Sequence, residues 1–392
     1  MKEGWTYKTF GEVGSFIRGK SIQKADFVEN GLPCIHYGQI HTKFGVFVDK
    51  HLTEIPIELY NKSAIASCGD VIIAITSEDL EGSCKSTAWL GDYDIAVSSH
   101  AAVYKHNLNP KFIAYYLRSK SFYYEKMKYA RGFKVMEIKP TDIEKIPIPI
   151  PPLAEQERIV AELDLLSSII DKKKTQLKEL DQLAQSIFYT MFGDPITNEK
   201  GWETSSLSTL CSITSSKRIF ADEYIEKGIP FYRSKEVIEK SKGKKLTTEL
   251  FISEKRYQEI KSKYGVPSIG DILITAVGTI GEVWVVDTTE PFYFKDGNLL
   301  WLKIKGETNP QYFRFLLLIL IDEYKKKMAN GAAYAALTIV NLNKMSTNII
   351  PLPLQQEFAS KVEAIERQKS LIQQSIVETQ TLFDSRMDHW FG

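Results

Sequence analysis

One stretch of the sequence matches a phosphate-binding pattern. Gly14 to Ser21 read GSFIRGKS and satisfy G-x-x-x-x-G-K-S, in which the amides of a glycine-rich loop hold phosphates and the lysine reaches the terminal phosphate. The loop contains Phe16, Ile17 and Arg18, which are too bulky for a tight phosphate nest. The corresponding stretch later in the chain, Cys211 to Arg218, lacks both glycines. We therefore expect no nucleotide site here.

Two pairs of carboxylates have a separation that a metal-dependent nuclease could use. They are Asp70 with Glu81, and Asp271 with Glu282. Such nucleases also need a lysine two residues after the glutamate, which orients water and stabilises charge on the phosphate. Ser83 and Trp284 stand at those positions. Asp70 and Asp271 each follow a glycine, so turns that lead into strands explain them better, and a nuclease is the weaker alternative.

The remaining reactive residues form no constellation that recurs along the chain. The sequence has no N-P-P-Y or D-P-P-Y tetrapeptide, no F-x-G-x-G loop for a methyl donor, and no repeated Ser-His-Asp or Cys-His arrangement. Cys34, His36 and His41 lie close together, but no second pair of ligands follows at a zinc-site spacing. We expect a binding protein without catalytic residues, metal, cofactor or small-molecule ligand.

The composition is that of a soluble globular protein. Of 392 residues, 43% are hydrophobic and 25% are charged, enough for two domains with separate cores. The longest apolar run, Phe313 to Ile321, is interrupted by Arg314, and the N-terminus has no apolar signal region. Four cysteines without paired spacing favour a reduced, cytoplasmic protein.

Charge is balanced overall but uneven along the chain. A formal net charge of +1 argues against a nucleic-acid-binding protein that acts alone. Lysines and arginines nevertheless crowd residues 217–263. Such runs are usually solvated faces. A smaller basic group consists of Arg118, Lys120, Lys126, Lys128, Arg131 and Lys134.

The sequence repeats itself after about 200 residues, a period too long for a solenoid and typical of a duplicated domain. The regions between the shared positions differ, as in Cys34 to Gln39 against Phe231 to Glu236. One scaffold with two different linings indicates two different ligands; loops that drifted without function are the alternative. The shared marks are Gly4-Trp5 with Gly201-Trp202, Gly69-Asp70 with Gly270-Asp271, Asn109-Pro110 with Asn309-Pro310, and the strip PIPIPPLAEQE ending at Glu157 with IIPLPLQQE ending at Glu357.

Each half is predicted to be a compact α+β domain that exits through a proline-rich strip, Pro147 to Pro152 or Pro351 to Pro353. In the first half, strands are expected at Asp70 to Thr76 and Ile95 to Tyr104, and a helix near Phe112 to Met127. The second half repeats them at Asp271 to Val277, Leu299 to Ile304 and Gln311 to Met328.

A long helix with a narrow apolar seam follows each strip. Such a seam needs a partner helix, for which the other copy is available. Two helices of about 40 residues, roughly 60 Å long, would hold the domains apart as an antiparallel pair. Helices folded back on their own domains, or a seam covered by a partner chain, are the alternatives. The seam residues are Leu163, Leu166, Ile170, Leu177, Leu180, Ala184, Ile187 and Met191, then Val362, Ile365, Ile372, Ile376, Phe383 and Trp390, with Lys173, Lys369, Thr379 and Arg386 as exceptions.

This order of elements resembles the DNA-specificity subunit of type I restriction-modification systems. The motifs are the variable α+β domain, PPLAEQERIV at Pro151 to Val160, a helix ending in Phe192-Gly193, and the whole pattern again to Phe391-Gly392. The resemblance covers the entire chain, although the second strip is degraded to PLPLQQE. It implies an α+β fold of two similar target-recognition domains separated by two long helices in an antiparallel coiled coil, with an internal pseudo-twofold repeat. The expected boundaries are 1–151 and 194–351 for the recognition domains, and 152–193 and 352–392 for the conserved helices.

The resemblance further implies a non-catalytic subunit that recognises a bipartite target in double-stranded DNA. Its helices would dock two methyltransferase subunits and, through them, restriction subunits. A subunit that binds DNA only inside an assembly need not be strongly basic, because its partners supply phosphate contacts. The alternative is a cytoplasmic coiled-coil adaptor that holds two protein-binding domains.

Base readout needs side chains with donors and acceptors on loops that can enter the major groove. By this criterion the first domain offers Tyr37, Gln39, His41, Thr76, Ser77, Ser99, His100, Arg131 and Lys134. The second domain offers Tyr232, Arg233, Ser234, Lys235, Thr279, Lys295, Asp296, Asn298, Asn330 and Tyr334. Lys20, Lys217 and Arg218 are expected to anchor phosphates.

Overall fold

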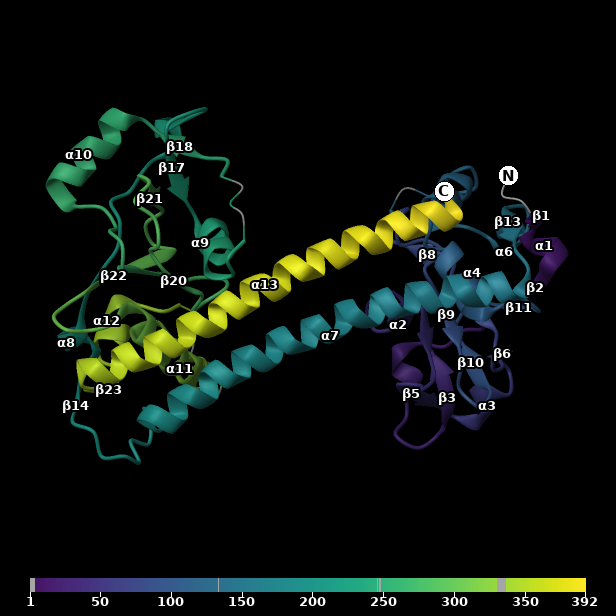
Figure 1. Cartoon of the computed structure of the whole chain (residues 1–392), viewed down its shortest axis with the longest axis horizontal. Coiled ribbons are helices and arrows are strands. Elements are labelled where there is room, and N and C mark those ends of the chain that lie inside the picture. Colours follow the sequence, from purple (N-terminus) through teal and green to yellow (C-terminus); the bar gives the residue numbers. More distant parts are fainter. Residues whose placement is uncertain (1–3, 133, 245, 247, 330–335) are drawn as a thin grey trace. The chain divides into compact units, whose positions relative to one another are not determined.

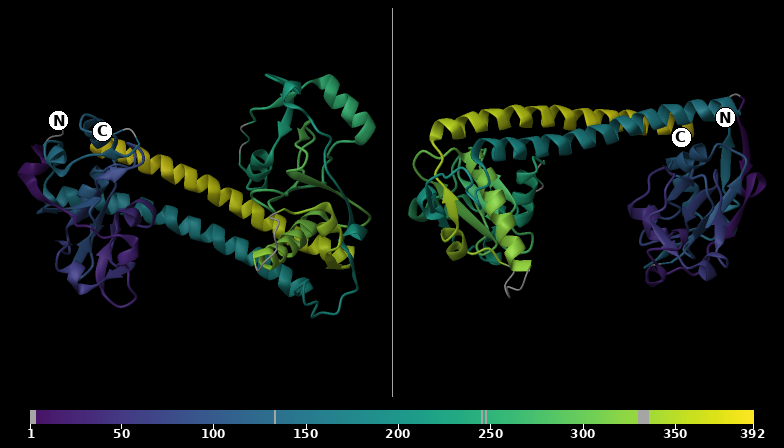
Figure 2. Two further views of the ribbon diagram at one scale, coloured as in Figure 1. Left: turned by 180° about the vertical axis from the view of Figure 1, so that it is seen from behind. Right: turned by 90° about the horizontal axis from the view of Figure 1, so that it is seen from below.

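The computed structural model describes residues 4–132, 134–244, 246, 248–329 and 336–392. The chain divides into two units, of which unit 1 comprises Met1–Lys174 with Gln374–Gly392 and unit 2 comprises Thr175–Gln373. Each unit contains an α+β body and part of two 40-residue helices, α7 (Leu153–Phe192) and α13 (Leu352–Phe391). Both helices run without a break in all views (Figures 1 and 2).

The body of unit 1 contains both strands and short helices. Its strands are β1 (Thr6–Thr9), β2 (Gly14–Arg18), β3 (Leu32–Ile35), β4 (Phe47–Val48), β5 (Thr53–Ile55), β6 (Ala64–Ala66), β7 (Val71–Ala74), β8 (Thr76–Ser77), β9 (Ser86–Trp89), β10 (Ile95–Val97), β11 (Ala101–His106), β12 (Met136–Glu137) and β13 (Pro147–Ile150). Its helices are α1 (Phe10–Val13), η1 (Lys24–Asp26), α2 (Tyr37–Thr42), α3 (Ile57–Tyr60), α4 (Pro110–Tyr116), α5 (Lys120–Met127) and α6 (Pro140–Ile143).

Two sheets organise this body. One has the order β2-β11-β7-β9-β4 and the other the order β5-β3-β10-β6, while β1 pairs with β13 and β8 with β12. Every residue of β7 and β9 is buried, because both faces of this sheet are covered.

The body of unit 2 follows the same plan with fewer strands. They are β14 (Thr204–Ser206), β15 (Cys211–Thr214), β16 (Tyr224–Ile225), β17 (Ile229–Tyr232), β18 (Phe251–Ile252), β19 (Ile272–Thr275), β20 (Val283–Val285), β21 (Tyr293–Phe294), β22 (Leu299–Ile304) and β23 (Ser346–Asn348). The helices are α8 (Leu207–Leu210), η2 (Ala221–Glu223), α9 (Ser234–Ser241), α10 (Glu254–Tyr264), α11 (Pro310–Ala329) and α12 (Ile339–Asn343). The sheets have the orders β15-β22-β19-β20, β16-β18-β17-β21 and β14-β23.

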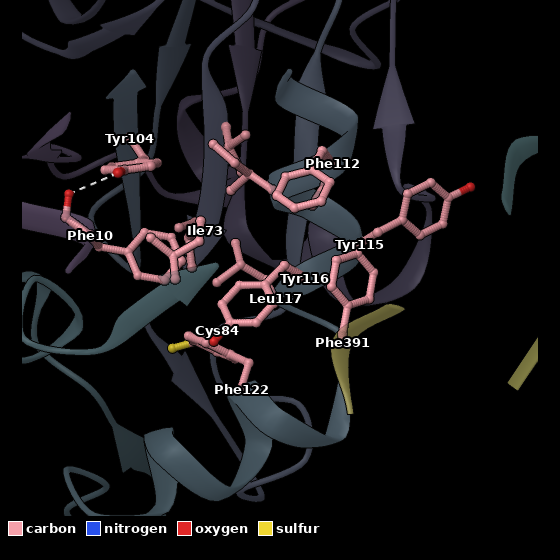
Figure 3. Packing of buried hydrophobic residues seen from close by; sticks show 14 of the residues in the cluster. Phe10, Ile73, Cys84, Tyr104, Phe112, Tyr115, Tyr116, Leu117, Phe122 and Phe391 are labelled. Carbon is pink, nitrogen blue, oxygen red and sulfur yellow. Dashed lines mark hydrogen bonds between the residues drawn. The ribbon is translucent and has the colours of Figure 1, made fainter. Parts of the chain in front are cut away.

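Aromatic residues at the end of a long helix complete the core of each unit. In unit 1 the ring of Phe391 on α13 lies 5.4 Å from that of Phe112 and 5.8 Å from that of Tyr116 (Figure 3). In unit 2 the rings of Phe188 and Phe192 on α7 lie 5.8 and 4.9 Å from Tyr312. The alternative in which each helix folds back only on its own domain is therefore wrong.

The internal repeat extends to individual hydrogen bonds. Gln156 accepts from the Asn109 amide at 2.9 Å and donates to the Pro151 carbonyl at 2.9 Å. Gln355 makes the same contacts, with the Asn309 amide at 2.8 Å and the Ile350 carbonyl at 2.7 Å. Gln355 is thus the counterpart of Gln156, and aligning the two strips by their final glutamates is wrong by one residue.

Within each unit the two long helices are antiparallel. In unit 1, Lys173 donates to the hydroxyl oxygens of Ser375 at 2.5 Å and Thr379 at 2.9 Å, and Glu162 pairs with Arg386. In unit 2, Lys369 pairs with Asp181 at 2.7 Å. The polar exceptions in the heptad pattern therefore meet polar partners, and the predicted seam is confirmed.

Two predicted elements are interrupted in unit 1. The helix expected near Phe112 to Met127 is two helices, because the Ser119 hydroxyl accepts from the Phe122 amide and starts a new helix there. The strand expected at Ile95 to Tyr104 is β10 and β11, which belong to different sheets. In unit 2 the corresponding helix is continuous, as predicted. Among the described residues, no helix is long and apolar enough to cross a bilayer.

Candidate nucleic-acid interface

Five of the residues predicted for base readout line one cavity of unit 1, with a volume of about 850 Å³. They come from separate elements: α2 provides two, β8 two, and the turn before β11 one. The five are Tyr37, His41, Thr76, Ser77 and His100.

The start of α2 fixes the aromatic wall of this cavity. His36 caps the helix through its Nδ1, which accepts from the Gly38 amide at 3.2 Å, and Gln39 returns the contact by accepting from the His36 amide at 2.9 Å. The Tyr37 amide donates to the Ser98 hydroxyl at 2.8 Å. The Tyr37 ring then lies 4.9 Å from the ring of His100. Gln39 is thus used for capping.

Hydrogen bonds join the polar residues of the cavity. His41 Nε2 lies 3.0 Å from the carbonyl oxygen of Thr76, so this nitrogen carries the proton and donates. The Thr76 hydroxyl lies 3.1 Å from His100 Nδ1, and the Lys85 ammonium donates to the His41 carbonyl at 2.8 Å. The result is an aromatic surface with donors and acceptors at fixed positions, which suits contact with base edges.

The other predicted residues of unit 1 lie outside this cavity lining. Lys20 is exposed, and its amide donates to the Val97 carbonyl at 3.2 Å. Ser99 is half-buried. Arg131 and Lys134 are exposed, and the Arg131 guanidinium lies 3.6 Å from the carboxylate of Asp142.

Sequence reasoning missed five charged residues that line the cavity. Glu78, Asp79 and Glu81 are exposed on the loop after β8, Lys85 precedes β9, and Arg118 follows α4. A carboxylate can accept from the amino group of cytosine, so both glutamates have a possible role in readout. Glu78 directly follows Thr76 and Ser77 in the sequence, and Glu81 was noted only for its spacing from Asp70.

Arg118, from the smaller basic group, is exposed, but its guanidinium is bound to the fold. Its guanidinium donates to the carbonyl oxygens of Gly45 at 2.7 Å and Ser86 at 2.9 Å. Burial lowers its pKa. The residue therefore connects the loop before β4 to the central sheet.

In unit 2 the predicted residues around α9 are largely engaged with one another or with the core. Tyr232 is buried, its ring is stacked 4.7 Å from that of Phe292, and burial raises its pKa to about 12. Arg233 pairs with Glu236 at 2.9 Å, and both it and Lys235 reach Glu249. The hydroxyl of Ser234 is buried and has no hydrogen-bond partner among the described residues.

A second group in unit 2 forms around the turn before β22. Arg218 pairs with Asp296 at 2.8 Å, and the Lys217 ammonium lies 4.4 Å from the centre of the Tyr264 ring. The Lys295 amide donates to the Tyr232 carbonyl at 2.9 Å. Arg218, predicted to anchor a phosphate, is thus paired with Asp296, predicted to contact bases.

Asn298 corresponds to His100 in the backbone. The Ala276 amide donates to the Asn298 carbonyl at 2.8 Å, as the Ile75 amide does to the His100 carbonyl at 2.9 Å. Thr279 is exposed on the loop after β19. The predicted residues Asn330 and Tyr334 lie outside the described part of the chain.

The sequence matches the Methylase_S family, described as the type I restriction modification DNA specificity domain, over residues 2–182 and again over 199–381. The chain belongs to this family. A type I restriction enzyme specificity subunit of Haemophilus influenzae is 29% identical over 275 residues, which cover 68% of this chain and 67% of that protein. The StySPI specificity subunit of Salmonella potsdam is 26% identical over 54% of this chain and 49% of its own length. The chain thus spans about half to two thirds of these relatives.

Two solved structures share the fold. The S subunit of a type I restriction-modification system from M. genitalium has a TM-score of 0.54 at 15% identity and covers 98% of this chain and 95% of its own. A chain from a study of complex assembly and conformational transition in a type I system has a TM-score of 0.61 at 19% identity, with 100% and 98% covered. The predicted fold class is thereby confirmed.

The carboxylates with nuclease-like spacing are turn residues in this specificity subunit. Asp70 accepts from the Ser67 amide at 2.7 Å and from the Lys105 ammonium at 2.7 Å. Asp271 accepts from the Ser268 amide and from the Trp301 indole, both at 2.9 Å. Hydrogen bonds within the fold thus occupy both carboxylates, as the interpretation from sequence requires.

The stretch with the phosphate-binding pattern is a strand and not a loop. Gly14–Arg18 form β2, which pairs antiparallel with β11, so this backbone is extended and does not curl into a phosphate-binding loop. A side chain at Gly14 would clash with the Lys105 carbonyl, which explains this glycine without a ligand. Among the described residues, no group of three potential metal ligands is found.

Proposed function

We propose that this chain reads a bipartite target in double-stranded DNA, one half with each body, and performs no catalysis itself. The observation that carries the proposal is one hydrogen-bonded framework present twice with different loops. The buried glutamines Gln156 and Gln355 recur with the same partners, whereas the cavity of unit 1 is lined by histidines and the matching region of unit 2 by salt-bridged arginines. Equal scaffolds with unequal linings suit two different half-sites.

In this proposal the domains and helices have the boundaries predicted from the sequence. Residues 1–151 and 194–351 act as target-recognition domains, and residues 152–193 and 352–392 as conserved helices. Apart from Gln39 and Tyr232, the residues predicted for DNA contact keep that role here, with Tyr37, His41, Thr76, Ser77 and His100 as the core of the first reading surface. Gln39 and Tyr232 contribute by holding the surface and do not touch bases.

The helices dock two methyltransferase subunits in this proposal and, through them, the restriction subunits. Apolar side chains that the helix seam leaves exposed support such partners. They are Leu165 and Leu183 on α7 and Leu371, Val377 and Leu382 on α13. Each is about half or more exposed, which is costly in an isolated subunit and is relieved when an apolar partner surface covers it.

The test is methylation of a DNA pool by the chain assembled with its methyltransferase partner. Two separately randomised blocks with a variable spacer would be methylated and sequenced. We expect enrichment of two different short sequences at a preferred separation. Enrichment of one contiguous site, or methylation at random, would contradict the proposal. An adaptor would show no sequence preference at all.

A further inference from the structure

Lys126 on α5 is a buried lysine whose ammonium binds one loop that lines the cavity of unit 1. Its side chain is 3% exposed. The ammonium donates to the carbonyl oxygens of Glu81 at 3.1 Å and Ser83 at 2.5 Å. Lysine is seldom buried unless its charge is matched, and burial lowers the pKa of Lys126 even though Cys84, Glu81 and Asp79 oppose this. Hydrogen bonds to these two carbonyl groups therefore offset part of the free-energy cost of removing the Lys126 ammonium from water.

The loop that Lys126 holds is longer than its counterpart in unit 2. In unit 1 the Cys84 amide donates to the Ala74 carbonyl at 2.9 Å and closes a loop of residues 76–83. In unit 2 the Gly281 amide donates to the Thr275 carbonyl at 2.8 Å and closes a loop of residues 277–280. Cys84 and Gly281 both have positive φ, +60° and +84°, so they occupy the same position. The first loop thus has additional residues with no equivalent in the second.

Loop 76–83 forms one wall of the cavity, to which seven of its residues contribute. Its internal hydrogen bonds are local, such as Asp79 Oδ1 accepting from the Gly82 amide at 2.6 Å and the Ser83 hydroxyl donating to the Leu80 carbonyl at 2.7 Å. Thr76 and Ser77 at the start of the loop are fixed by their pairing with β12, whereas the local bonds shape the turn that follows without joining it to the body. Lys126 joins its far end to α5.

We propose that Lys126 is a positioning residue that sets the sequence preference of the first recognition domain by fixing loop 76–83 against α5. The inference rests on the proposed function. Lys126 does not line the cavity, so it acts through Glu78 and Glu81, which do. Loss of its ammonium leaves two carbonyl groups without their donor and lets the wall move.

The experiment compares Lys126→Met with Lys325→Met in the full chain assembled with its methyltransferase partner. Lys325 is the matched control, because it is an exposed lysine beside the shorter loop, with its Nζ 3.2 Å from where a Cβ on Gly281 would lie. In the randomised pool, Lys126→Met should reduce discrimination in one half-site by at least about tenfold, the scale of a well-placed base contact. Discrimination in the other half-site should stay as in the wild type, and Lys325→Met should change neither. Lys126→Arg keeps a cationic donor and should retain part of the preference.

Hydrogen exchange of the isolated chain gives a readout that does not depend on DNA. In Lys126→Met the amides of Gly82 and Cys84 should exchange faster, while those of the central strand β7 stay protected. Unchanged exchange in the loop would overturn the anchoring itself. A folded Lys126→Met complex with unchanged half-site preference, or one that loses methylation equally on all sequences, would overturn the positioning role. A wild-type complex without a split preference would instead refute the proposed function.

Discussion

His106, at the end of β11, ties the stability of unit 1 to pH. Its Nδ1 accepts from the Leu108 amide at 3.2 Å, and its Nε2 is buried without a hydrogen-bond partner among the described residues. Burial lowers the pKa of His106 to about 4, partly offset by the charge of Asp70. An unfolded histidine has a pKa of about 6.5, so between these values the unfolded chain binds a proton that the folded chain does not. The free energy of unfolding should therefore fall as pH drops from about 6.5 to about 4, by at most about 3 kcal/mol from this residue. His106→Asn should flatten that slope in urea unfolding of the full chain, and an equally steep slope in the variant would contradict the assignment.

At the scale of single residues, the sequence predicted cavity-lining residues that follow the ends of buried strands. It did not predict residues whose side chains are buried by contacts with distant parts of the chain. Thr76 and Ser77 follow the end of β7 after one residue, and a polar residue there lies at the edge of the sheet. Lys126 could not be found in this way, because its acceptors lie 43 and 45 residues earlier in the chain. Tyr232 has a side chain suited to contact with bases, but it is buried and its ring stacks on that of Phe292. No local sequence pattern reveals this contact.

The junction between each body and its long helix depends on one buried glutamine. Gln156 and Gln355 are 2% and 3% exposed, and each joins the start of its helix to the asparagine that caps a body helix. Gln156→Ala should cost roughly 2 to 4 kcal/mol in unit 1, because a buried amide and a buried carbonyl lose their partner. Hydrogen exchange at the Asn109 amide should accelerate while the Asn309 amide stays protected, and Gln355→Ala should give the reverse. The exposed neighbour Glu157 provides the control, since Glu157→Ala should change neither. Equal acceleration at both asparagines would show that the junctions do not act locally.

Helices with a strong hydrophobic periodicity could be predicted from the sequence. Breaks within helices and strands that depend on tertiary contacts could not. The heptad spacing predicted α7 and α13, because an apolar stripe at this period can be buried only against another helix. The break between α4 and α5 was missed, since Ser119 also fits inside a helix and acts as a cap only when the chain turns there. The break between β10 and β11 in the strand expected at Ile95 to Tyr104 was missed for a similar reason, because Ser98 accepts from the Tyr37 amide, which is distant in sequence.

For the whole molecule, duplication was the most predictable property, while the function of each copy depends on its differences. Shared marks such as Asn109 and Asn309 recur as helix caps with the same glutamine partner. The loops of residues 76–83 and 277–280 differ in length, which alignment of the shared marks alone did not reveal. The proposed recognition of two half-sites rests on a frame that recurs in both bodies and on loops that differ between them, which becomes visible when the hydrogen bonds of the two bodies are compared.

In the proposed function, the lengths of α7 and α13 determine the distance between the two half-sites. Seven residues inserted after Lys174 in α7, with a matching heptad after Gln373 in α13, preserve the apolar register of both helices and add about 10 Å of helix. If these helices set the spacer, the second recognition domain must reach about three base pairs further, where the groove has turned by roughly 100° at 10 to 10.5 base pairs per turn. Methylation at the original spacer should therefore fall by at least about tenfold, since one half-site can no longer contribute its contacts. Inserting the heptad in α7 alone is the control that breaks the pairing and should destabilise the helices. Methylation of spacer libraries by the assembled complex provides the measurement, and retention of the original spacing preference in the double insertion would show that something other than the helices determines it.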